Sequence, residues 1–355
     1  MSHAVNRLDA VAAFGGRVAT DLVDVTTDLT ALDSSGWWAL QITYEGDALC
    51  LRFDDVRDDV RDGELRGGNW RGPSPAQWSS SMSRAEYLHA VNEVRELIAQ
   101  GTVYQVNVCR VLTARLPDSD GSGDVTGLHS LLRERNPAPY AGVVSVAAGM
   151  HPALGTTGIH LVTASPELYL DRDGDHVRSR PIKGTAREAR GLAPKDEAEN
   201  IMIVDLVRND LGMVCETGSV NVPDLLAEEV HPGMVHLVST VSGTLRADCG
   251  WAELIGASFP PGSVSGAPKS SAVKIIDGLE PTVRGPYCGA IGWVDADRQL
   301  GELAVGIRTF WREDDRLHFG TGAGITWGSD PQGEWEETQI KAEHLLDVAA
   351  GTWSA

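Results

Sequence analysis

Two segments of the sequence each carry a pair of acidic residues spaced for one face of a helix. Asp196 and Glu199 form the first pair, and Glu334 and Glu337, with Lys341 one turn later, form the second. Residues three or four apart share a helical face, so the two pairs could surround one cation, and Mg²⁺ prefers such oxygen ligands. Acids in the first turn of a helix also favour its dipole and face water. On spacing alone, this second interpretation is the commoner one.

A glycine-rich loop precedes a predicted helix within residues 259–277. The loop resembles a phosphate-binding loop, but Ala267 and Pro268 stand between the last glycine and Lys269, which breaks the required spacing. Proline also removes a backbone N–H that a phosphate cradle would use. The sequence therefore disfavours nucleotide binding, although the hydroxyl group of Ser263 and the N–H groups of the loop could still meet a carboxylate.

Three further residues have side chains capable of chemistry but stand alone in the sequence. Lys183 lies between a strand-like segment and a Gly-Thr turn, where most lysines are simply exposed. His236 lies in an apolar run, where a hydrogen-bonded core histidine is commoner than a catalytic one. Arg308 lies in an apolar strand, and a buried arginine needs an anionic partner, either a protein carboxylate or a ligand.

The elements that must position these residues are mostly antiparallel strands with helices between them. Apolar and β-branched residues alternate between turn signals, which is typical of hairpins and meanders. Helices are indicated by a period near 3.6 residues and, at Ser83, by a capping box with Glu86. This pattern predicts an α+β fold. The strand-rich segments are 37–53, 159–183 and 287–326; the helices are 83–101, 195–211 and 333–349; the loops are 58–82 and 117–124.

The composition excludes several classes of protein. The chain has 355 residues and a formal net charge of −20, which disfavours binding to nucleic acids and to anionic membranes. No apolar run reaches the roughly 18 residues that span a bilayer, and the N-terminus lacks a secretory signal core. The 5 cysteines are scattered without a CxxC pair, so we expect neither disulfides nor zinc, and a cytoplasmic location.

Ten segments of the sequence together form a recognisable series: VYQVNVCR (103–110), SPEL (165–168), RPIKGT (180–185), AENIMIVDLVRNDLG (198–212), VHLVSTVSG (235–243), PPGSVSGAPK (260–269), RGPYCGAIG (284–292), GIRT (306–309), GTGAGI (320–325) and EWEETQIKAE (334–343). In content and order they resemble the chorismate-utilising enzymes, which include the anthranilate, aminodeoxychorismate, isochorismate and salicylate synthases. The resemblance implies one α+β domain with two antiparallel sheets packed together and helices outside. Residues 1–82 would be its N-terminal strand-rich part and 83–355 its catalytic region.

The resemblance assigns a metal to the two acidic helices. Glu199 and Glu337 match direct ligands of an Mg²⁺ ion that binds the ring carboxylate of chorismate, and Asp196 and Glu334 would support them through water. Lys341 matches a residue that faces the same carboxylate. Chorismate is a dianion approaching a chain of charge −20, so this local group of cations would have to act at short range.

The resemblance also implies how the rest of the substrate is held. Arg308 and Tyr287 match the positions that bind the enolpyruvyl carboxylate. His236 matches a catalytic position that all branches of the family share, and therefore does not discriminate between them. The remaining positions expected to bind substrate are Gln105, Gly184, Thr185, Ser263, Gly322 and Gly324.

Two positions, Gln105 and Lys183, indicate which branch the sequence resembles. Gln105 stands where enzymes that add water at C2 have a lysine base, and a neutral amide cannot take that proton. Lys183 stands where anthranilate synthases usually have alanine, and is similar to the aminodeoxychorismate pattern, in which the amine attacks C2 before ammonia attacks C4. Glu167 matches the general acid for the departing C4 hydroxyl. Anthranilate synthesis is the alternative.

The implied reaction requires ammonia. The chain is too short to hold a glutamine amidotransferase beside a full synthase region, so the resemblance implies a heterodimer with a separate glutaminase subunit. With Lys183 at C2, the C2 proton need not be removed and pyruvate stays attached. The implied product is 4-amino-4-deoxychorismate, a precursor of 4-aminobenzoate in folate biosynthesis.

Overall fold

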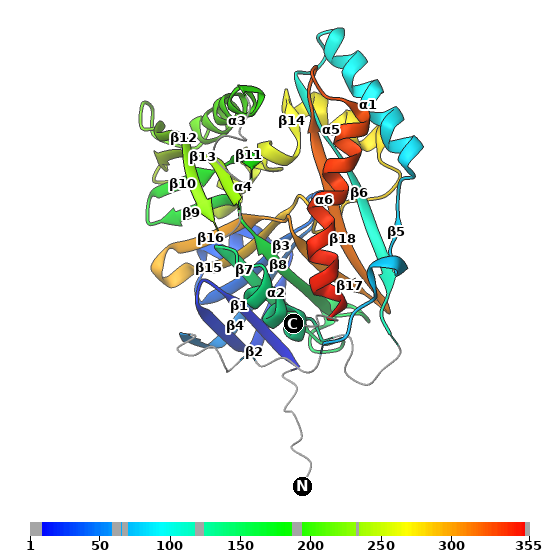
Figure 1. The fold of residues 1–355 in the computed structure, drawn as a ribbon. Coiled ribbons are helices and arrows are strands. Elements are labelled where there is room, and N and C mark those ends of the chain that lie inside the picture. Colours follow the sequence, from blue (N-terminus) through cyan, green and yellow to red (C-terminus); the bar gives the residue numbers. More distant parts are fainter. Residues whose placement is uncertain are drawn as a thin grey trace.

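Antiparallel strands with helices around them make up the described part of the chain (Figure 1). The computed structural model describes residues 9–58, 65, 70–117, 124–186, 194–231 and 234–351. Most of the predicted loop at 117–124 therefore lies outside the described residues. The predicted α+β class and the single large domain are confirmed.

Strands and helices occupy the segments predicted for them, and the structure adds elements for which the sequence analysis made no prediction. The strands are β1 (Ala10–Phe14), β2 (Arg17–Thr26), β3 (Trp37–Ile42), β4 (Ala48–Asp58), β5 (Ser79–Ser80), β6 (Gln105–Arg115), β7 (Tyr140–Val146), β8 (Ile159–Ser165), β9 (Leu168–Asp173), β10 (His176–Arg180), β11 (Ile182–Ala186), β12 (Asn221–His231), β13 (Met234–Thr244), β14 (Gly266–Ala267), β15 (Ala290–Asp295), β16 (Leu300–Val305), β17 (Thr309–Glu313) and β18 (Arg316–Ile325). The α-helices are α1 (Arg84–Ala99), α2 (Val125–Arg135), α3 (Pro194–Gly212), α4 (Trp251–Ser258), α5 (Lys269–Leu279) and α6 (Pro331–Ala350).

Strand pairing runs through two halves that one strand connects. The first half has the order β12, β13, β10, β9, β16, β15, β3, β4, and β11 also pairs with β13. The second half has the order β1, β7, β8, β17, β18, β6, and β5 and β14 also pair with β6. Because β2 pairs with both β4 and β1, the two expected sheets form one connected sheet of 18 strands in the described part.

Local sequence signals explain several of these elements. The hairpin predicted for 37–53 is β3 and β4, with Ile42 opposite Ala48. The meander predicted for 287–326 is wrong: β15 and β16 form one hairpin and β17 and β18 another, and β16 pairs with β9 whereas β17 pairs with β8. Strand β3 also pairs with β15, so the segment before residue 83 shares a sheet with the first of these hairpins.

Helix α1 begins at the predicted capping box. The Ser83 backbone N–H donates to Glu86 Oε2 at 2.7 Å, and the Glu86 N–H donates to Ser83 Oγ at 3.3 Å. Tyr87, Val91 and Val94 are buried on one helical face, as their spacing predicts. This face packs against β6 and α6.

Helices α3 and α6, which carry the acidic pairs, pack on different halves of the sheet. Helix α3 packs on β13 and β11, whereas α6 packs on β18 beside α1 (Figure 1). Asp330 caps α6, because its Oδ2 atom accepts a hydrogen bond from the Gly333 N–H at 2.8 Å. No helix in the described part of the chain has both the length and the apolarity needed to cross a membrane.

Candidate active site

Lys183, Glu167 and Ser263 meet where β11, the β8–β9 connection and the glycine-rich loop come together. The Lys183 Nζ atom donates a hydrogen bond to the Ser263 carbonyl oxygen at 2.8 Å. Glu167, which is 4% exposed, accepts a bond from the Ile182 backbone N–H at 3.3 Å through Oε1, and its carboxyl group also bonds to the Ser263 side chain. The fold therefore brings together three residues that the sequence analysis named, because Lys183 and Glu167 each bond to Ser263.

Glycines on one face of β18 let larger side chains lie across the strand. A Cβ atom on Gly324 would lie 2.4 Å from Gln105 Nε2 and 3.4 Å from Lys183 Nζ. Gln105 is 1% exposed, and its Oε1 atom has no hydrogen-bond partner among the described residues. Since Gln105 and Lys183 converge on the same glycine, a substrate that meets Lys183 would also meet this amide group.

The same face of β18 continues away from Lys183. Cys109 lies against Gly322, where an added Cβ would be 2.6 Å from its Sγ atom, and the Tyr287 ring lies against Gly320, at 2.0 Å. Alternate residues of a strand share a face, so Gly320, Gly322 and Gly324 form one row. The sequence analysis named Gly322, Gly324 and Tyr287 but missed Gly320 and Cys109. The pattern GTGAG, with glycine at every second position, could have indicated Gly320.

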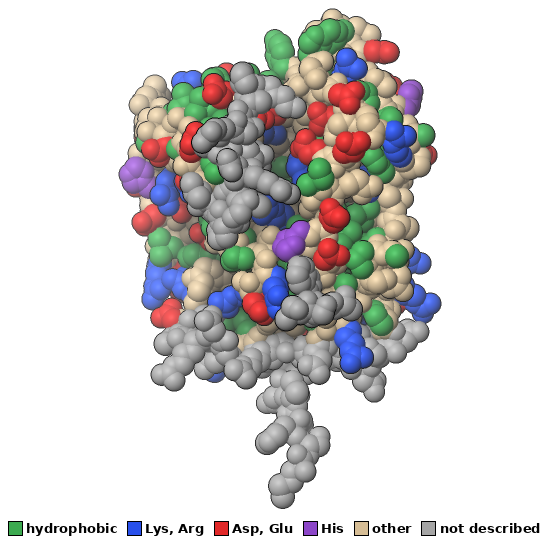
Figure 2. All heavy atoms as spheres, in the orientation of Figure 1, with side chains coloured by type: hydrophobic (Ala, Val, Ile, Leu, Met, Phe, Trp, Pro, Cys, Tyr) green, Lys and Arg blue, Asp and Glu red, His purple; other side chains and the backbone are tan. Residues whose placement is uncertain are grey.

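The side chain of Lys341 connects the acidic face of α6 to this row. Its Nζ atom lies 2.6 Å from Glu337 Oε1 and donates a hydrogen bond to the Gly322 carbonyl oxygen at 3.2 Å. Glu334, one turn before Glu337, is 4% exposed. Figure 2 shows Asp and Glu side chains over the side of the molecule that α6 occupies in Figure 1, with Lys or Arg side chains near the centre of this view.

Burial has opposite effects on the two groups expected to move protons. Desolvation lowers the pKa of Lys183, and the negative charges of Glu199 and Glu167 only partly offset this effect. Desolvation raises the pKa of Glu167, despite its hydrogen bond to Ser263 and the nearby charge of Lys183. A less basic amine and a less acidic carboxyl group suit a nucleophile and a general acid.

Carboxylates from α3 and α6 face the same amine. Both Glu199 and Glu337 raise the pKa of Lys183 through their charge, so both carboxylates lie within electrostatic range of this amine. The described residues contain no group of three or more His, Cys, Asp or Glu side chains arranged to hold a metal ion. Mg²⁺ often binds through one or two carboxylates and takes its other oxygens from water and from a bound anion. These oxygen donors fit Mg²⁺ in that arrangement.

The remaining predicted residues lie around this group. His236 is 2% exposed on β13, and its backbone pairs with that of Thr185 on β11, whose side chain lies outside the described part. Gly184, next to Lys183, has φ of +79°, a conformation that other residues rarely adopt. Arg308 was predicted within a strand but lies between β16 and β17, where its φ is +52°, a left-handed value that strands do not use. Burial lowers the pKa of its guanidinium group. Burial also raises the pKa of the Tyr287 hydroxyl group.

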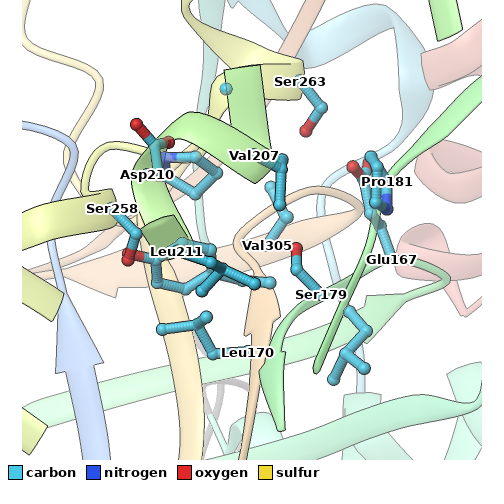
Figure 3. Close-up of a pocket in the computed structure, with 14 residues that line it drawn as sticks. Glu167, Leu170, Ser179, Pro181, Val207, Asp210, Leu211, Ser258, Ser263 and Val305 are labelled. Carbon is cyan, nitrogen blue, oxygen red and sulfur yellow. The ribbon is translucent and has the colours of Figure 1, made fainter. Parts of the chain in front are cut away.

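A small cavity lies behind Glu167 and Ser263. Its volume is about 20 Å³, room for a single water molecule. In Figure 3, Glu167 and Pro181 lie on one side of the cavity and Asp210 on the other, with the apolar side chains of Val207 and Val305 between them. The cavity therefore separates the candidate acid from the Asp210 carboxylate of α3.

The chain belongs to the chorismate-binding enzymes, whose family model matches residues 68–347. Aminodeoxychorismate synthase component 1 of Klebsiella aerogenes is 37% identical over 282 residues, which cover 76% of this chain and 59% of that protein. Anthranilate synthase component 1 of Streptomyces coelicolor is 38% identical over 282 residues, which cover 76% of this chain and 52% of that protein. The aligned part thus spans between half and three fifths of these relatives.

Solved structures share the fold over nearly the whole chain. A structure described as a 2,3-dihydroxybenzoate-specific isochorismate synthase from Bacillus anthracis covers 98% of both chains with a TM-score of 0.79 and 22% identity. Anthranilate synthase component I from Streptococcus pneumoniae covers 98% of this chain and 82% of that one, with a TM-score of 0.71 and 24% identity. At these identities the likeness establishes the architecture alone.

Proposed function

We propose that this chain is the synthase subunit of an aminodeoxychorismate synthase, which converts chorismate and ammonia into 4-amino-4-deoxychorismate. The observation that carries the proposal is the position of Lys183. Its amine donates a hydrogen bond to the Ser263 carbonyl, approaches the same glycine as the Gln105 amide and lies within electrostatic range of Glu167. A lysine with a lowered pKa in such a place is a candidate nucleophile.

In the proposed first step, the Lys183 amine attacks C2 of chorismate. The new C–N bond forms as both ring double bonds shift and the C4–O bond breaks. Glu167 donates its proton to the departing hydroxyl group, which leaves as water. The Lys183 nitrogen is then a secondary ammonium group, and it keeps its proton until the second step.

In the second step, ammonia attacks C4, both ring double bonds shift back and the C2–N bond to Lys183 breaks. Lys183 leaves as a neutral amine, because its nitrogen kept its proton, and the carboxylate of Glu167 can accept the proton that the new C4 ammonium group releases. The enolpyruvyl group is untouched, so a separate lyase would be needed to give 4-aminobenzoate.

Side chains from both acidic helices are assigned to the ring carboxylate. Glu199 and Glu337 would hold Mg²⁺, with Asp196 and Glu334 supporting them through water, and the bound ion would neutralise the ring carboxylate of chorismate. The Lys341 ammonium group, which is held against the Gly322 carbonyl, adds a second positive charge on the same side.

The rest of the substrate would lie against the row of glycines on β18 and the residues beside that row. Arg308 and Tyr287 are assigned to the enolpyruvyl carboxylate, and the backbone of Gly322 and Gly324 to the ring. Gln105 can position ammonia without acting as a base, because its amide stays neutral. Gly184, Thr185, Ser263 and His236 complete the proposed site.

Ammonia would come from a separate glutaminase subunit. The relatives from Klebsiella aerogenes and Streptomyces coelicolor are both named component 1, which is in keeping with a second component in those enzymes. Free ammonium should replace that subunit in a test with the purified chain.

Anthranilate synthesis is the second candidate, because an anthranilate synthase is as similar to this chain as an aminodeoxychorismate synthase. The two reactions differ in the fate of the enolpyruvyl group. The lysine at position 183 favours the first reaction, since a covalent bond at C2 makes removal of the C2 proton unnecessary.

The test is to incubate the purified chain with chorismate, Mg²⁺ and ammonium at about pH 8.5, where a lysine of lowered pKa is partly neutral, and to identify products by mass spectrometry. We expect a product that keeps the enolpyruvyl group and yields 4-aminobenzoate only after a lyase is added. Lys183→Ala should form far less of it, and the exposed Lys274→Ala should behave like the wild type. Direct release of anthranilate and pyruvate would reject the proposal in favour of the second candidate.

A further inference from the structure

The buried arginine of β6 holds the middle of α6. Arg110 is 2% exposed. Its Nε atom donates to Thr338 Oγ1 at 3.1 Å and its NH2 group to Gln339 Oε1 at 3.0 Å, both on α6. Its NH1 group donates to Ser80 Oγ of β5 at 3.2 Å. One guanidinium group thus connects two strands to the helix that carries the acidic pair.

An aromatic ring of α6 completes this contact. The Arg110 guanidinium lies 4.5 Å from the centre of the Trp335 ring, a cation–π geometry. Helix α1 also contacts this ring: the centres of the Tyr87 and Trp335 rings lie 5.6 Å apart, in an edge-on arrangement. The backbone carbonyl of Thr338 accepts a further bond from Thr321 Oγ1 of β18 at 2.9 Å.

The residues that Arg110 contacts alternate along α6 with those assigned to the ring carboxylate. Trp335, Thr338 and Gln339 lie roughly a third of a turn around the helix from the acidic face, given about 100° per residue. The acidic face consists of Glu334, Glu337 and Lys341. Fixing one of these faces therefore fixes the direction in which the other points.

We infer that Arg110 is a positioning residue that sets the rotation of α6 and so aims its acidic face at the bound metal and substrate carboxylate. The inference rests on the proposed function, because the acidic face is assigned to Mg²⁺ there. A planar guanidinium with several donors in a fixed fork can hold a helix at three residues at once. A lysine at this position would keep the charge but could not make the same set of contacts.

The test measures chorismate binding by calorimetry, without ammonium, in the presence of Mg²⁺ and in the presence of EDTA. The ratio of the two dissociation constants reports how much the metal contributes. We expect Arg110→Gln and Arg110→Lys to reduce this ratio roughly tenfold, the lower end of the loss seen when groups that orient metal ligands are removed. Gln339→Ala, at an exposed position, should reduce it in the same direction by less.

The control is Arg115→Gln, on the same strand but at an exposed side chain that pairs with Asp315 at 2.8 Å. It should leave the ratio unchanged. Equal weakening with Mg²⁺ and with EDTA in the Arg110 variants would indicate general packing and overturn the inference, as would an unchanged ratio. Wild-type binding that does not depend on Mg²⁺ would instead reject the metal site of the proposed function. Gln339→Ala keeps the test decisive if the Arg110 variants do not fold.

Discussion

Burial acts on Lys183 and Glu167 in opposite directions because one is charged when protonated and the other when deprotonated. It lowers the pKa of the amine and raises the pKa of the carboxyl group. The two groups also attract each other when both are charged, which opposes both shifts. Since desolvation outweighs this attraction at both residues, the neutral amine and the neutral acid are both more accessible than in water. That pair of states is the one the proposed first step requires.

Glu167→Gln tests this pairing through the pH dependence of the reaction. In the wild type the reactive form has a neutral Lys183 and a protonated Glu167, so kcat/KM should rise with pH on the acid side and fall on the alkaline side. Glutamine donates no proton as an acid, so we expect a loss of roughly 10²–10⁴-fold. Only the rise that accompanies deprotonation of Lys183 should remain. The measurement is initial rate against pH at a constant concentration of unprotonated ammonia.

The control for this profile is Glu96→Gln, which alters an exposed carboxyl group of α1. Its profile should match that of the wild type. If Glu167→Gln kept the alkaline fall, another group would have to supply the proton, and the role assigned to Glu167 would be wrong.

At the scale of elements, the sequence predicted those that depend on contacts close in the chain. The capping box at Ser83 and the hairpins β3–β4, β15–β16 and β17–β18 all carry their own turn or cap signals. The connection of two halves through β2 was not predicted, because it depends on residues far apart in the sequence. Pairing between distant strands leaves no local pattern to detect.

The candidate site likewise depends on contacts between residues far apart in the sequence, which local patterns do not reveal. The sequence assigned roles to Lys183 and Glu167 only through a family resemblance, and spacing alone favoured an exposed lysine. Their contact depends on the return of β11 beside the glycine-rich loop, which periodicity does not specify. Cys109 was missed because its approach to Gly322 depends on the register of β6 against β18.

The buried ion pair between α5 and α3 should be a large contributor to the stability of the site's surroundings. Lys269 Nζ lies 2.7 Å from Asp210 Oδ2 and also donates to the Ser258 carbonyl. Lys269→Met would leave the Asp210 carboxylate buried without its cation, so we expect a loss of about 3–5 kcal/mol in the free energy of unfolding. Urea denaturation measures this loss.

The double variant provides the control for this pair. Lys269→Met with Asp210→Leu removes both charges and should recover much of the stability that the single change loses, since apolar replacements of a buried pair are often tolerated. Additive losses, or a single-variant loss below about 1 kcal/mol, would show that the pair contributes no more than an exposed one.

At the scale of the whole molecule, the net charge of the chain and the local charge of the site act on an anionic ligand in opposite directions. The net charge of −20 would repel the proposed dianionic substrate at long range. Within the site, Lys341 is held by Glu337 and by the Gly322 carbonyl, so a cationic group is fixed on the side assigned to the ring carboxylate. Screening by salt is weaker at such short distances, which lets a few local charges decide binding.

The stability of the whole molecule toward acid should depend on a histidine far from the candidate site. His129 of α2 is 3% exposed, its Nδ1 atom has no hydrogen-bond partner among the described residues, and burial lowers its pKa to about 4. The unfolded chain takes up a proton on this residue below a pH of about 6.5, whereas the folded chain does so only near pH 4. The folded state is therefore penalised progressively as the pH falls from 6.5 toward 4, and not above that range.

His129→Gln should remove this penalty. Between pH 7.5 and pH 5, its free energy of unfolding should fall by about 2 kcal/mol less than that of the wild type, since each pH unit below 6.5 is worth about 1.4 kcal/mol. Urea denaturation at the two pH values measures the difference, and the variant can be less stable than the wild type at both without affecting it. His89→Gln, at a side chain that is 80% exposed, should show the wild-type loss. Equal losses in the wild type and His129→Gln would mean that His129 gains access to water or to a partner before it is protonated, and that its burial does not limit acid stability.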